Sequence, residues 1–331
     1  MRTYLFGIFT FFVFSINITS SYAQQLKIRT SGTRTSIRGL SVVDDKTIWA
    51  SGSNGMIARS VDGGANFIWV QIPNFEKRDF RDIEAFDSNT AIIIAIAEPA
   101  HILKTVDGGK TWKIVFADST KGMFLDALSF NDKLSGIAIG DPIENKTFIA
   151  TTSDGGNTWT KQLNTPVLEE GEAFFASSGT NILSNKMEPI FVSGGKKSNL
   201  YINNKMYPLP IVQGLESTGA NSIAIHKNKA IVVGGDFSKD SIAINNCVLI
   251  DFKTMKFSKP NTSLGGYRSC VSFINKKRVI ACGLNGIDIS DDAGQNWKTI
   301  SKESFHVVAK AKRGKTVFLA GSKGKIGTII F

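Results

Sequence analysis

The sequence predicts an all-β protein, a seven-bladed β-propeller with an N-terminal strand closing the last blade. Three observations lead to this fold. One turn motif recurs four times, its copies follow a constant period, and no helical periodicity is sustained after the N-terminus. A ring of four-stranded blades accommodates such a period in a chain of 331 residues. We therefore expect one domain, although length alone would favour two.

The first 23 residues are expected to be a signal peptide, outside the fold. Arg2 gives a positive start, residues 4–18 are apolar, and Ser21 and Ala23 are the small residues that precede a cleavage site. This apolar run is short for a membrane span of about 20 residues, so an uncleaved anchor is the weaker alternative. Residues 24–331 are then expected to be an exported chain, periplasmic or extracellular, that forms a single propeller domain.

A turn motif with the pattern Ser/Thr-x-Asp-x-Gly-x-x-aromatic defines the repeat. Its aspartate can accept backbone N–H groups of its own loop, its glycine can adopt a left-handed backbone, and its aromatic side chain can pack into the next layer. We call the four copies the aspartate turns. They are SVDGGANF at residues 60–67, TVDGGKTW at 105–112, TSDGGNTW at 152–159 and SDDAGQNW at 290–297.

The spacing of the aspartate turns counts the blades. Asp62, Asp107 and Asp154 follow one another at 45 and 47 residues, and Asp292 comes 138 residues after Asp154, which is three times 46. Two blades without the motif therefore lie between the third and fourth copies. Their inner strand pairs are interpreted as residues 172–177 with 190–194, and residues 222–225 with 230–234.

The two ends of the chain predict how the ring closes. Strands are expected after the last aspartate turn at residues 305–309, 316–320 and 325–331, where the chain stops, so the seventh blade lacks its outer strand. An open strand edge is an aggregation liability. Residues 25–30 belong to no other blade, and we expect them to supply the missing strand.

Charge and histidine content exclude several functions. The net charge is +11, or +10 without Arg2, and its lysines are not interleaved with the aromatic residues that a single-strand nucleic-acid platform needs. No nucleic-acid partner is expected. His101, His226 and His306 belong to different blades and lack ligand spacing, so neither a metal nor another cofactor is expected.

The cysteines give little support for a disulfide framework. Cys247, Cys270 and Cys282 are odd in number and have no CxxC spacing. We expect buried free thiols. A bridge between Cys270 and Cys282, on neighbouring strands, is the alternative.

The aspartate turns resemble the BNR or Asp-box repeats of sialidases and of photosystem II stability/assembly factor-like propellers. Segments such as SIRGLSVVDD at 36–45, GMFLDALSF at 122–130 and EGEAFFASSGT at 170–180 resemble a bacterial branch whose members are often labelled oxidoreductase or glycosyl hydrolase. The resemblance covers essentially residues 25–331 and implies the propeller fold. Blades four and five depart from it, because residues 201–209 and 248–257 replace the turn, so we expect remodelled outer turns there.

The functional site is expected on the face opposite the aspartate turns. Strand direction alternates in a blade, so a turn between the third and fourth strands lies on the face opposite the start of the first strand. That opposite face carries the starts of the inner strands and the loops between second and third strands. Aligning the inner strands gives Arg38, Arg81, Asp126, Glu172, Asn221, Arg268 and Phe305, with Asp82, Tyr267 and His306 adjacent. The loops contribute Asn54, Glu98, Asp141, Asp236, Asn285 and Lys323.

Charged side chains at a narrow channel mouth are partly desolvated, as is common at binding sites. We expect Arg38, Arg81 and Arg268 to hold an anionic group by bidentate hydrogen bonds. Carboxylates such as Asp126 or Glu172 would hold hydroxyl groups or a cation. In the alternative, the arginines and carboxylates neutralise one another and plug the channel.

Three function classes remain. The favoured one is a binding or assembly module for a protein, an envelope polymer or a small polar or anionic ligand. A sialidase-like glycoside hydrolase is the alternative, because arginines, a tyrosine and carboxylates make up such sites. However, Arg38 is followed by Gly39 and Leu40, without the proline of the sialidase arginine motif. An oxidoreductase is the third class, and the sequence has neither a dinucleotide fingerprint nor a haem motif.

Overall fold

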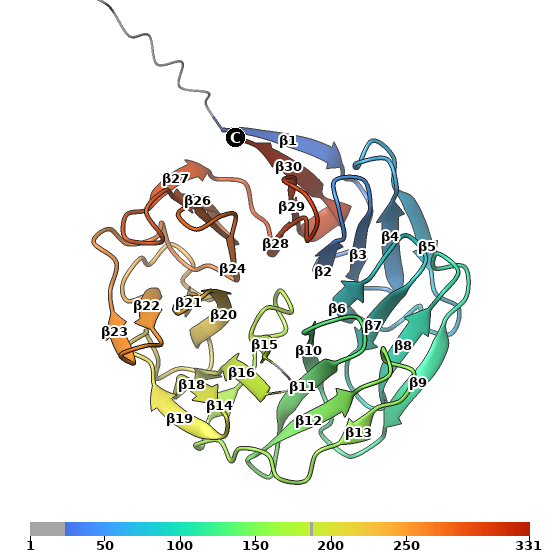
Figure 1. The fold of residues 1–331 in the computed structure, drawn as a ribbon, viewed down its shortest axis with the longest axis horizontal. Helices are drawn as coiled ribbons and strands as arrows, with labels where there is room; N and C mark the ends of the chain where they lie inside the picture. The colour runs from blue at the N-terminus through green and yellow to red at the C-terminus, as the bar shows by residue number, and fades with distance from the viewer. Residues whose placement is uncertain (1–23, 186–187) are drawn as a thin grey trace, which may run out of the picture.

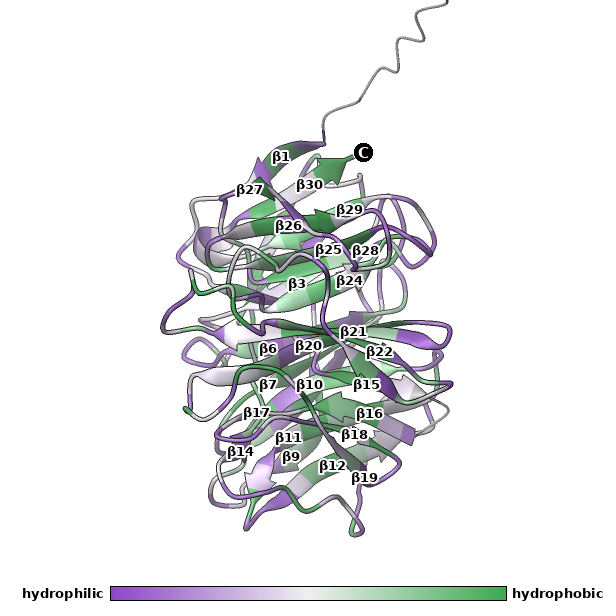
Figure 2. Ribbon diagram, turned by 90° about the vertical axis from the view of Figure 1, so that its left-hand side faces the viewer, coloured by the Kyte–Doolittle hydropathy of each residue, from purple (hydrophilic) through white to green (hydrophobic). Residues whose placement is uncertain are grey.

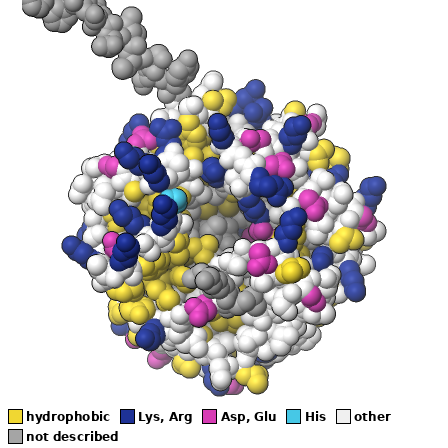
Figure 3. Space-filling view, viewed as in Figure 1, with side chains coloured by type: hydrophobic (Ala, Val, Ile, Leu, Met, Phe, Trp, Pro, Cys, Tyr) yellow, Lys and Arg dark blue, Asp and Glu magenta, His cyan; other side chains and the backbone are white. Residues whose placement is uncertain are grey.

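The computed structural model describes residues 24–185 and 188–331, so the expected signal peptide lies outside the described residues. The described chain forms seven antiparallel sheets arranged as the blades of a ring (Figure 1). This confirms the predicted all-β, seven-bladed fold. Viewed down the ring axis, the molecule is hollowed at its centre (Figure 3).

The first three blades are regular meanders of four strands, and the first strand of each lies next to the channel. Blade one consists of β2 (Ile37–Val42), β3 (Ile48–Gly52), β4 (Met56–Ser60) and β5 (Ile68–Gln71). Blade two consists of β6 (Phe80–Ala85), β7 (Ala91–Ala95), β8 (Ala100–Thr105) and β9 (Lys113–Asp118). Blade three consists of β10 (Leu125–Phe130), β11 (Gly136–Ile143), β12 (Lys146–Thr152) and β13 (Thr160–Lys161).

The fourth and fifth blades share an irregular junction. Blade four consists of β15 (Ile182–Asn185), β16 (Glu188–Val192), β18 (Asn199–Ile202) and β19 (Lys205–Pro208). Blade five consists of β20 (Thr218–His226), β21 (Lys229–Asp236), β22 (Cys247–Asp251) and β23 (Lys256–Ser258). Two short strands, β14 (Glu172–Ala173) and β17 (Gly194–Gly195), extend the sheet of blade five.

The last two blades lead back to the N-terminus. Blade six consists of β24 (Cys270–Phe273), β25 (Val279–Gly283), β26 (Gly286–Ser290) and β27 (Lys298–Ser301). Blade seven consists of β28 (Val307–Lys310), β29 (Val317–Ala320), β30 (Ile326–Ile330) and, as its outer strand, β1 (Gln25–Thr30). A turn of 3-10 helix, Ser322–Gly324, precedes β30.

The ring closes as predicted, because β1 pairs antiparallel with β30 (Figure 1). Leu26 lies opposite Ile329, and Leu26 packs against the buried cluster that joins blades six, seven and one. The first described strand and the last strand of the chain thus belong to one sheet. This pairing covers the strand edge that blade seven would otherwise expose.

Second strands are buried on both sides because each blade packs between two neighbours. Every residue of β3, β7 and β25 is buried, whereas the outer strands β5 and β9 contain exposed residues. Figure 2 shows hydrophobic strands within the stacked blades and hydrophilic residues in many of the loops. All three cysteines are buried and free, as expected, although Cys270 and Cys282 lie opposite each other on β24 and β25.

The aspartate turns follow the third strands β4, β8, β12 and β26, as predicted. In the first copy, Ser60 Oγ donates to Asp62 Oδ1 at 2.8 Å and accepts from the Gly64 N–H at 2.9 Å. Hydrogen bonds from the backbone and side chain of Asn66 lower the pKa of Asp62 to about 2. Each motif is therefore a self-contained turn whose aspartate is already saturated with local donors.

The inner strand of blade four differs from the sequence interpretation. Residues 172–177 were expected to form it, but only Glu172 and Ala173 are in a strand, and they pair with Gly195 and Gly194. The inner strand is instead β15, which pairs with β16. Between β14 and β15, residues 174–181 leave the sheet and enter the channel, where they contact blades two, five and six. We call residues 174–181 the plug loop.

Candidate functional site

The plug loop divides the central channel into two cavities. Its first half, residues 174–177, lines a cavity of about 330 Å³ together with the starts of the inner strands. Its second half, residues 178–180, lines a cavity of about 580 Å³ together with the ends of the inner strands. We call the first the arginine cavity and the second the turn-face cavity.

The turn-face cavity lies on the face of the aspartate turns. Each aspartate turn donates a backbone hydrogen bond to the turn between the first and second strands of its own blade, for example Gly63 N–H to the Lys46 carbonyl at 2.9 Å. The turn-face cavity is bordered by turns of this second kind, including residues 131–133. The arginine cavity is therefore on the opposite face, where the sequence places the functional site.

β-bulges aim side chains at the channel. Four inner strands contain one extra residue near their beginning, where the pairing with the second strand of the blade is interrupted. These residues are Arg38 in β2, Arg81 in β6, Asp126 in β10 and Asn221 in β20. A bulge re-aims the side chain of the extra residue. Arg38, Arg81 and Asn221 all line the arginine cavity, whereas Asp126 is completely buried and does not line it.

Six of the sixteen residues that the sequence places on this face line the arginine cavity. These are Arg38, Arg81, Asp141, Asn221, Tyr267 and His306. The other ten do not line it, and they are Asn54, Asp82, Glu98, Asp126, Glu172, Asp236, Arg268, Asn285, Phe305 and Lys323.

The two arginines of the cavity differ in their partners. Arg81 forms an ion pair with Asp79 at 3.1 Å and donates to the carbonyl of Ala176 in the plug loop at 3.2 Å. Arg38 has neither a side-chain hydrogen bond nor an ion pair among the described residues. Burial and then the like charge of Arg81 lower the pKa of Arg38, although a guanidinium remains charged at neutral pH. The guanidinium of Arg38 thus has no directly contacting counter-ion among the described residues.

Burial raises the pKa of two carboxyl groups near the arginines. Asp141 Oδ1 accepts the Phe174 N–H at 2.9 Å, and burial raises the pKa of Asp141 to about 6. Asp126 is fully buried, and neither of its carboxyl oxygens has a hydrogen-bond partner among the described residues. Burial and then the charge of Asp141 raise the pKa of Asp126 well above its ordinary value. Burial therefore favours the neutral form of the Asp126 carboxyl group.

His306 and Tyr267 complete the polar lining of the cavity. Burial and then the charge of Arg38 lower the pKa of His306 to about 4, so its ring is neutral at pH 7. Its Nδ1 lies 2.9 Å from the carbonyl oxygen of Ile37. Tyr267 Oη donates to Asn221 Oδ1 at 2.7 Å, and burial raises the pKa of Tyr267 to about 12. Neither group carries a charge that could neutralise the arginines.

Arg268 occupies a different position from the one expected. The Arg268 N–H donates to the carbonyl of Gly234 in the preceding blade, blade five. The Ile37 N–H likewise donates to the carbonyl of Gly321 in its preceding blade, blade seven. Arg268 is thus equivalent to Ile37, and Ser269 stands where Arg38 stands. The side chain of Arg268 points into blade six and pairs with Asp288. The sequence alignment was therefore one residue out of register here, and also at Phe305, whose N–H makes the same bond.

The remaining acids are held by local partners. Glu172 accepts from Tyr201 Oη at 2.6 Å and from the Asn199 side chain. Asp236 accepts from the N–H and the hydroxyl of Ser238 at 2.9 and 2.7 Å. Glu98 is exposed and accepts the Gly122 N–H. Asp82 lines the turn-face cavity, on the opposite side of the plug loop.

Aromatic residues form the part of the site that the sequence did not indicate. Phe124, Phe174, Phe175 and Phe237 line the arginine cavity. The rings of Phe175 and Phe237 meet edge to face at 5.7 Å, and Phe237 is more than a third exposed. In the sequence, the one available indication of this wall was Phe237, a large apolar residue that directly follows the second strand of blade five. Two of these residues come from the first half of the plug loop, residues 174–177, which the sequence predicts to be part of a strand.

The part of the chain described here contains no cluster of three or more metal-ligating side chains. No helix among the described residues is long and apolar enough to cross a membrane. The arginine cavity combines two guanidinium groups, one of them without an ion-pair partner, with an aromatic wall, and this arrangement suits an anionic group that carries an apolar neighbour.

Comparison with solved structures finds other propellers. The structure of YCF48 bound to D1 peptide aligns over 93% of this chain and 97% of that chain, with a TM-score of 0.67 and 17% identity. YCF48 from Cyanidioschyzon merolae aligns over 92% and 98%, with a TM-score of 0.65 and 16% identity. The WD40 β-propeller domain of Doa1 aligns over 93% and 97%, with a TM-score of 0.63 and 11% identity.

These likenesses establish the propeller fold. No family model matches the sequence. The search of curated proteins also finds no match.

Proposed function

We propose that this protein is a non-enzymatic binding module that takes an acidic segment of a partner protein into the arginine cavity. The observation that carries the proposal is the unpaired guanidinium of Arg38 beside Arg81 in a single cavity. Two like charges in a partly desolvated site repel each other. A carboxylate placed between them would remove this repulsion and accept charge-assisted hydrogen bonds from both.

The size and lining of the cavity favour a peptide segment over a whole folded surface. A volume of about 330 Å³ accommodates one or two side chains. The aromatic wall supplies an apolar contact next to the arginines, and interface hot spots combine such anchors with arginine. We therefore expect the acidic residue of the partner to be followed or preceded by an apolar one.

The likeness to known structures supports a protein partner. One similar propeller, YCF48, is described as bound to D1 peptide. We propose that the present chain is related to the photosystem II assembly factor-like propellers and that its aspartate turns are Asp-box repeats. Export of residues 24–331 after removal of a signal peptide is part of the same proposal.

A glycoside hydrolase receives less support from the cavity. Most such enzymes use a pair of carboxyl groups on either side of the scissile bond, and sialidases use a tyrosine nucleophile together with an acid. Among the residues that the structure describes, Asp141 is the one carboxyl group in the lining of the arginine cavity. Tyr267 is hydrogen-bonded to Asn221, and Glu172 is held by Tyr201 inside blade four. We therefore do not propose hydrolysis.

A peptide selection tests the proposal. Residues 24–331 would be screened against a displayed library of random peptides, and the affinity of the strongest ligand would be measured by fluorescence anisotropy. We expect the selected peptides to contain Asp or Glu, and Arg38→Ala and Arg81→Ala to weaken binding roughly tenfold or more each.

Arg313→Ala is the matched control, because Arg313 is an exposed arginine on the other face, paired with Asp44. It should leave the affinity unchanged. Circular dichroism melting curves would establish that each variant is folded. Selected peptides without acidic residues, or equal affinity in the Arg38→Ala/Arg81→Ala double variant, would contradict the proposal.

A further inference from the structure

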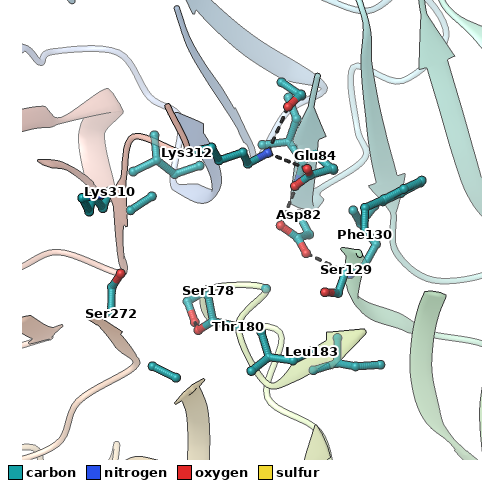
Figure 4. Close-up of a pocket in the computed structure, with 18 of the residues that line it drawn as sticks. Asp82, Glu84, Ser129, Phe130, Ser178, Thr180, Leu183, Ser272, Lys310 and Lys312 are labelled. Atoms are coloured by element: carbon teal, nitrogen blue, oxygen red, sulfur yellow. Dashed lines mark hydrogen bonds and ion pairs between the residues drawn. The ribbon is translucent and has the colours of Figure 1, made fainter. Parts of the chain in front are cut away.

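The turn-face cavity is a second, separate hollow, and the proposed function makes no use of it. Its floor consists of Ser178, Gly179 and Thr180 of the plug loop, with the carboxyl group of Asp82 beside them (Figure 4). The Ser178 hydroxyl donates to the Ser269 carbonyl at 2.7 Å, and Thr180 Oγ1 lies 2.7 Å from Ser222 Oγ. These bonds tie the floor to blades five and six. The cavity is thus closed below by an anchored loop.

Cations exceed acids around this cavity. Lys312 pairs with Glu84, and Arg313 pairs with Asp44. Asp132 accepts the backbone N–H groups of two residues of its own turn. Lys133 and Lys310 also line the cavity, and neither has an ion pair or a side-chain hydrogen bond among the described residues. The rim therefore has unpaired positive charge that an anionic group can neutralise.

The lower part of the cavity offers hydroxyl and carboxyl groups. Asp82 is nearly buried and accepts the N–H groups of Ile83 at 2.7 Å and Leu128 at 2.9 Å. A carboxyl group has about four lone-pair positions, so Asp82 can accept further hydrogen bonds. Burial raises the pKa of Asp82 well above its ordinary value, so its neutral form can also donate one.

Two serines add polar capacity on opposite sides of the cavity. The Ser129 hydroxyl accepts the Ser184 N–H at 3.0 Å and still has its own proton to donate. Ser272 has no side-chain hydrogen bond among the described residues. In Figure 4, Asp82 and Ser129 lie on one side, and Ser272 and Lys310 lie across the cavity from them. Groups that both donate and accept match the hydroxyl groups of a polyol.

We propose that the turn-face cavity binds a small polyhydroxylated anion, a sugar acid or a sugar phosphate. Its anionic group would contact Lys310 at the rim. Its hydroxyl groups would contact Asp82, Ser129 and Ser272. The carbon face of its ring would pack on the apolar wall formed by Leu183, Ile225 and Phe273. A volume of about 580 Å³ accommodates one or two sugar units.

Isothermal titration with defined probes tests this site. D-glucuronate and glucose 6-phosphate represent the two sources of negative charge. D-glucose lacks the anionic group, and propionate and inorganic phosphate lack the hydroxyl groups. We expect saturable binding of glucuronate or glucose 6-phosphate at millimolar concentration, and at least roughly tenfold weaker binding of all three partial probes.

Variants then locate the binding. Lys310→Ala should weaken binding of the anionic sugar roughly tenfold, and Ser272→Ala roughly threefold or more. Neither change removes a contact that holds the fold, so both variants should melt like the parent. Arg38→Ala is the control, because it removes a residue of the other cavity and should leave this affinity unchanged.

Three results would overturn the inference. They are no saturable binding of either anionic sugar, equally strong binding of propionate or phosphate, and unchanged affinity in Lys310→Ala. The inference does not rest on the proposed function. Loss of peptide binding with retained sugar binding would reject only the first, and the reverse result would reject only the second.

Discussion

Arg268 and Asp288 form a buried ion pair inside blade six, with Nη2 of the arginine 2.7 Å from Oδ2 of the aspartate. Both side chains are at most 1% exposed. Asp288 also accepts the Gly265 N–H at 2.9 Å and the Thr299 hydroxyl at 2.6 Å. The pair is therefore a structural element of the blade, and the side chain of Arg268 does not line the arginine cavity.

Removing one partner of this pair should destabilise the protein strongly. Arg268→Met leaves Asp288 as a buried charge without a cation, and we expect the free energy of unfolding to fall by about 3–5 kcal/mol. Arg268→Met/Asp288→Leu should lose less, because it removes both charges. Urea denaturation followed by tryptophan fluorescence measures both. If Arg268→Met unfolded at the parent's urea concentration, the pair would not have the importance that we assign to it.

The closing strand should contribute to the stability of the whole ring. A chain that begins after Gly32 lacks β1, so β30 becomes an open edge and Leu26 no longer covers the core. We expect the melting temperature to fall by more than about 5 °C. Lys27→Ala, an exposed change within the same strand, should have little effect. A shortened chain that melted within a degree or two of the parent would show that closure by β1 is dispensable.

Gly179 should be required for the shape of the plug loop. Its φ is +67°, and a Cβ added there would overlap the carboxyl group of Asp82. Gly122 has a similar φ of +83° with no atom within 4 Å of an added Cβ, so it is the matched control. We expect Gly179→Ala to cost about 1–3 kcal/mol more than Gly122→Ala in chemical denaturation. If both variants lost the same free energy of unfolding, the plug loop would be able to move away from Asp82.

Peptide binding to the arginine cavity should strengthen as the pH falls from 7.5 to 5. Asp141 has a pKa of about 6, so it is an anion above that pH and neutral below it. The negative charge that competes with the ligand is thus lost on acidification. Acidic residues of a peptide remain mostly ionised at pH 5. The other groups facing the site are Arg38, Arg81 with Asp79, Asp126, whose pKa is raised by burial, and His306, which has a pKa of about 4.

Asp141→Asn separates this effect from other titrations. The variant should bind at pH 7.5 as strongly as the parent binds at pH 5, roughly three- to tenfold more tightly than the parent at pH 7.5. Its affinity should then be nearly independent of pH over this range. A parent whose affinity weakens on acidification would contradict the assignment of Asp141.

Much of the fold could be predicted because its signals are local. The aspartate turns recur at the blade period, so Asp62, Asp107, Asp154 and Asp292 place the blades without any long-range information. Closure by β1 could be predicted because residues 25–30 belong to no other blade and the seventh blade otherwise lacks an outer strand. Blade four could not be predicted in this way. Its residues 172–177 are apolar enough for a strand, and only the turn formers that follow them indicate a loop.

The site was harder to predict than the fold, since it depends on strand register. A shift of one residue moves a side chain from the channel to the blade interior. Arg38 and Arg81 lie at the expected starts of their inner strands, where the structure has bulges. In contrast, β24 begins at Cys270, and the sequence has no marker for this start. The aromatic wall was missed because half of it comes from the plug loop, which has no counterpart in the other blades.

A charge exchange at Arg38 tests the central claim most directly. Arg38→Glu should reduce affinity for the selected acidic peptide by roughly a hundredfold. It should at the same time gain affinity for the same peptide with its acidic residue replaced by lysine, which the parent should not bind. Fluorescence anisotropy measures the affinity of the parent and of Arg38→Glu for each of the two peptides. If Arg38→Glu bound the acidic peptide as tightly as the parent, the arginine cavity would not be the binding site.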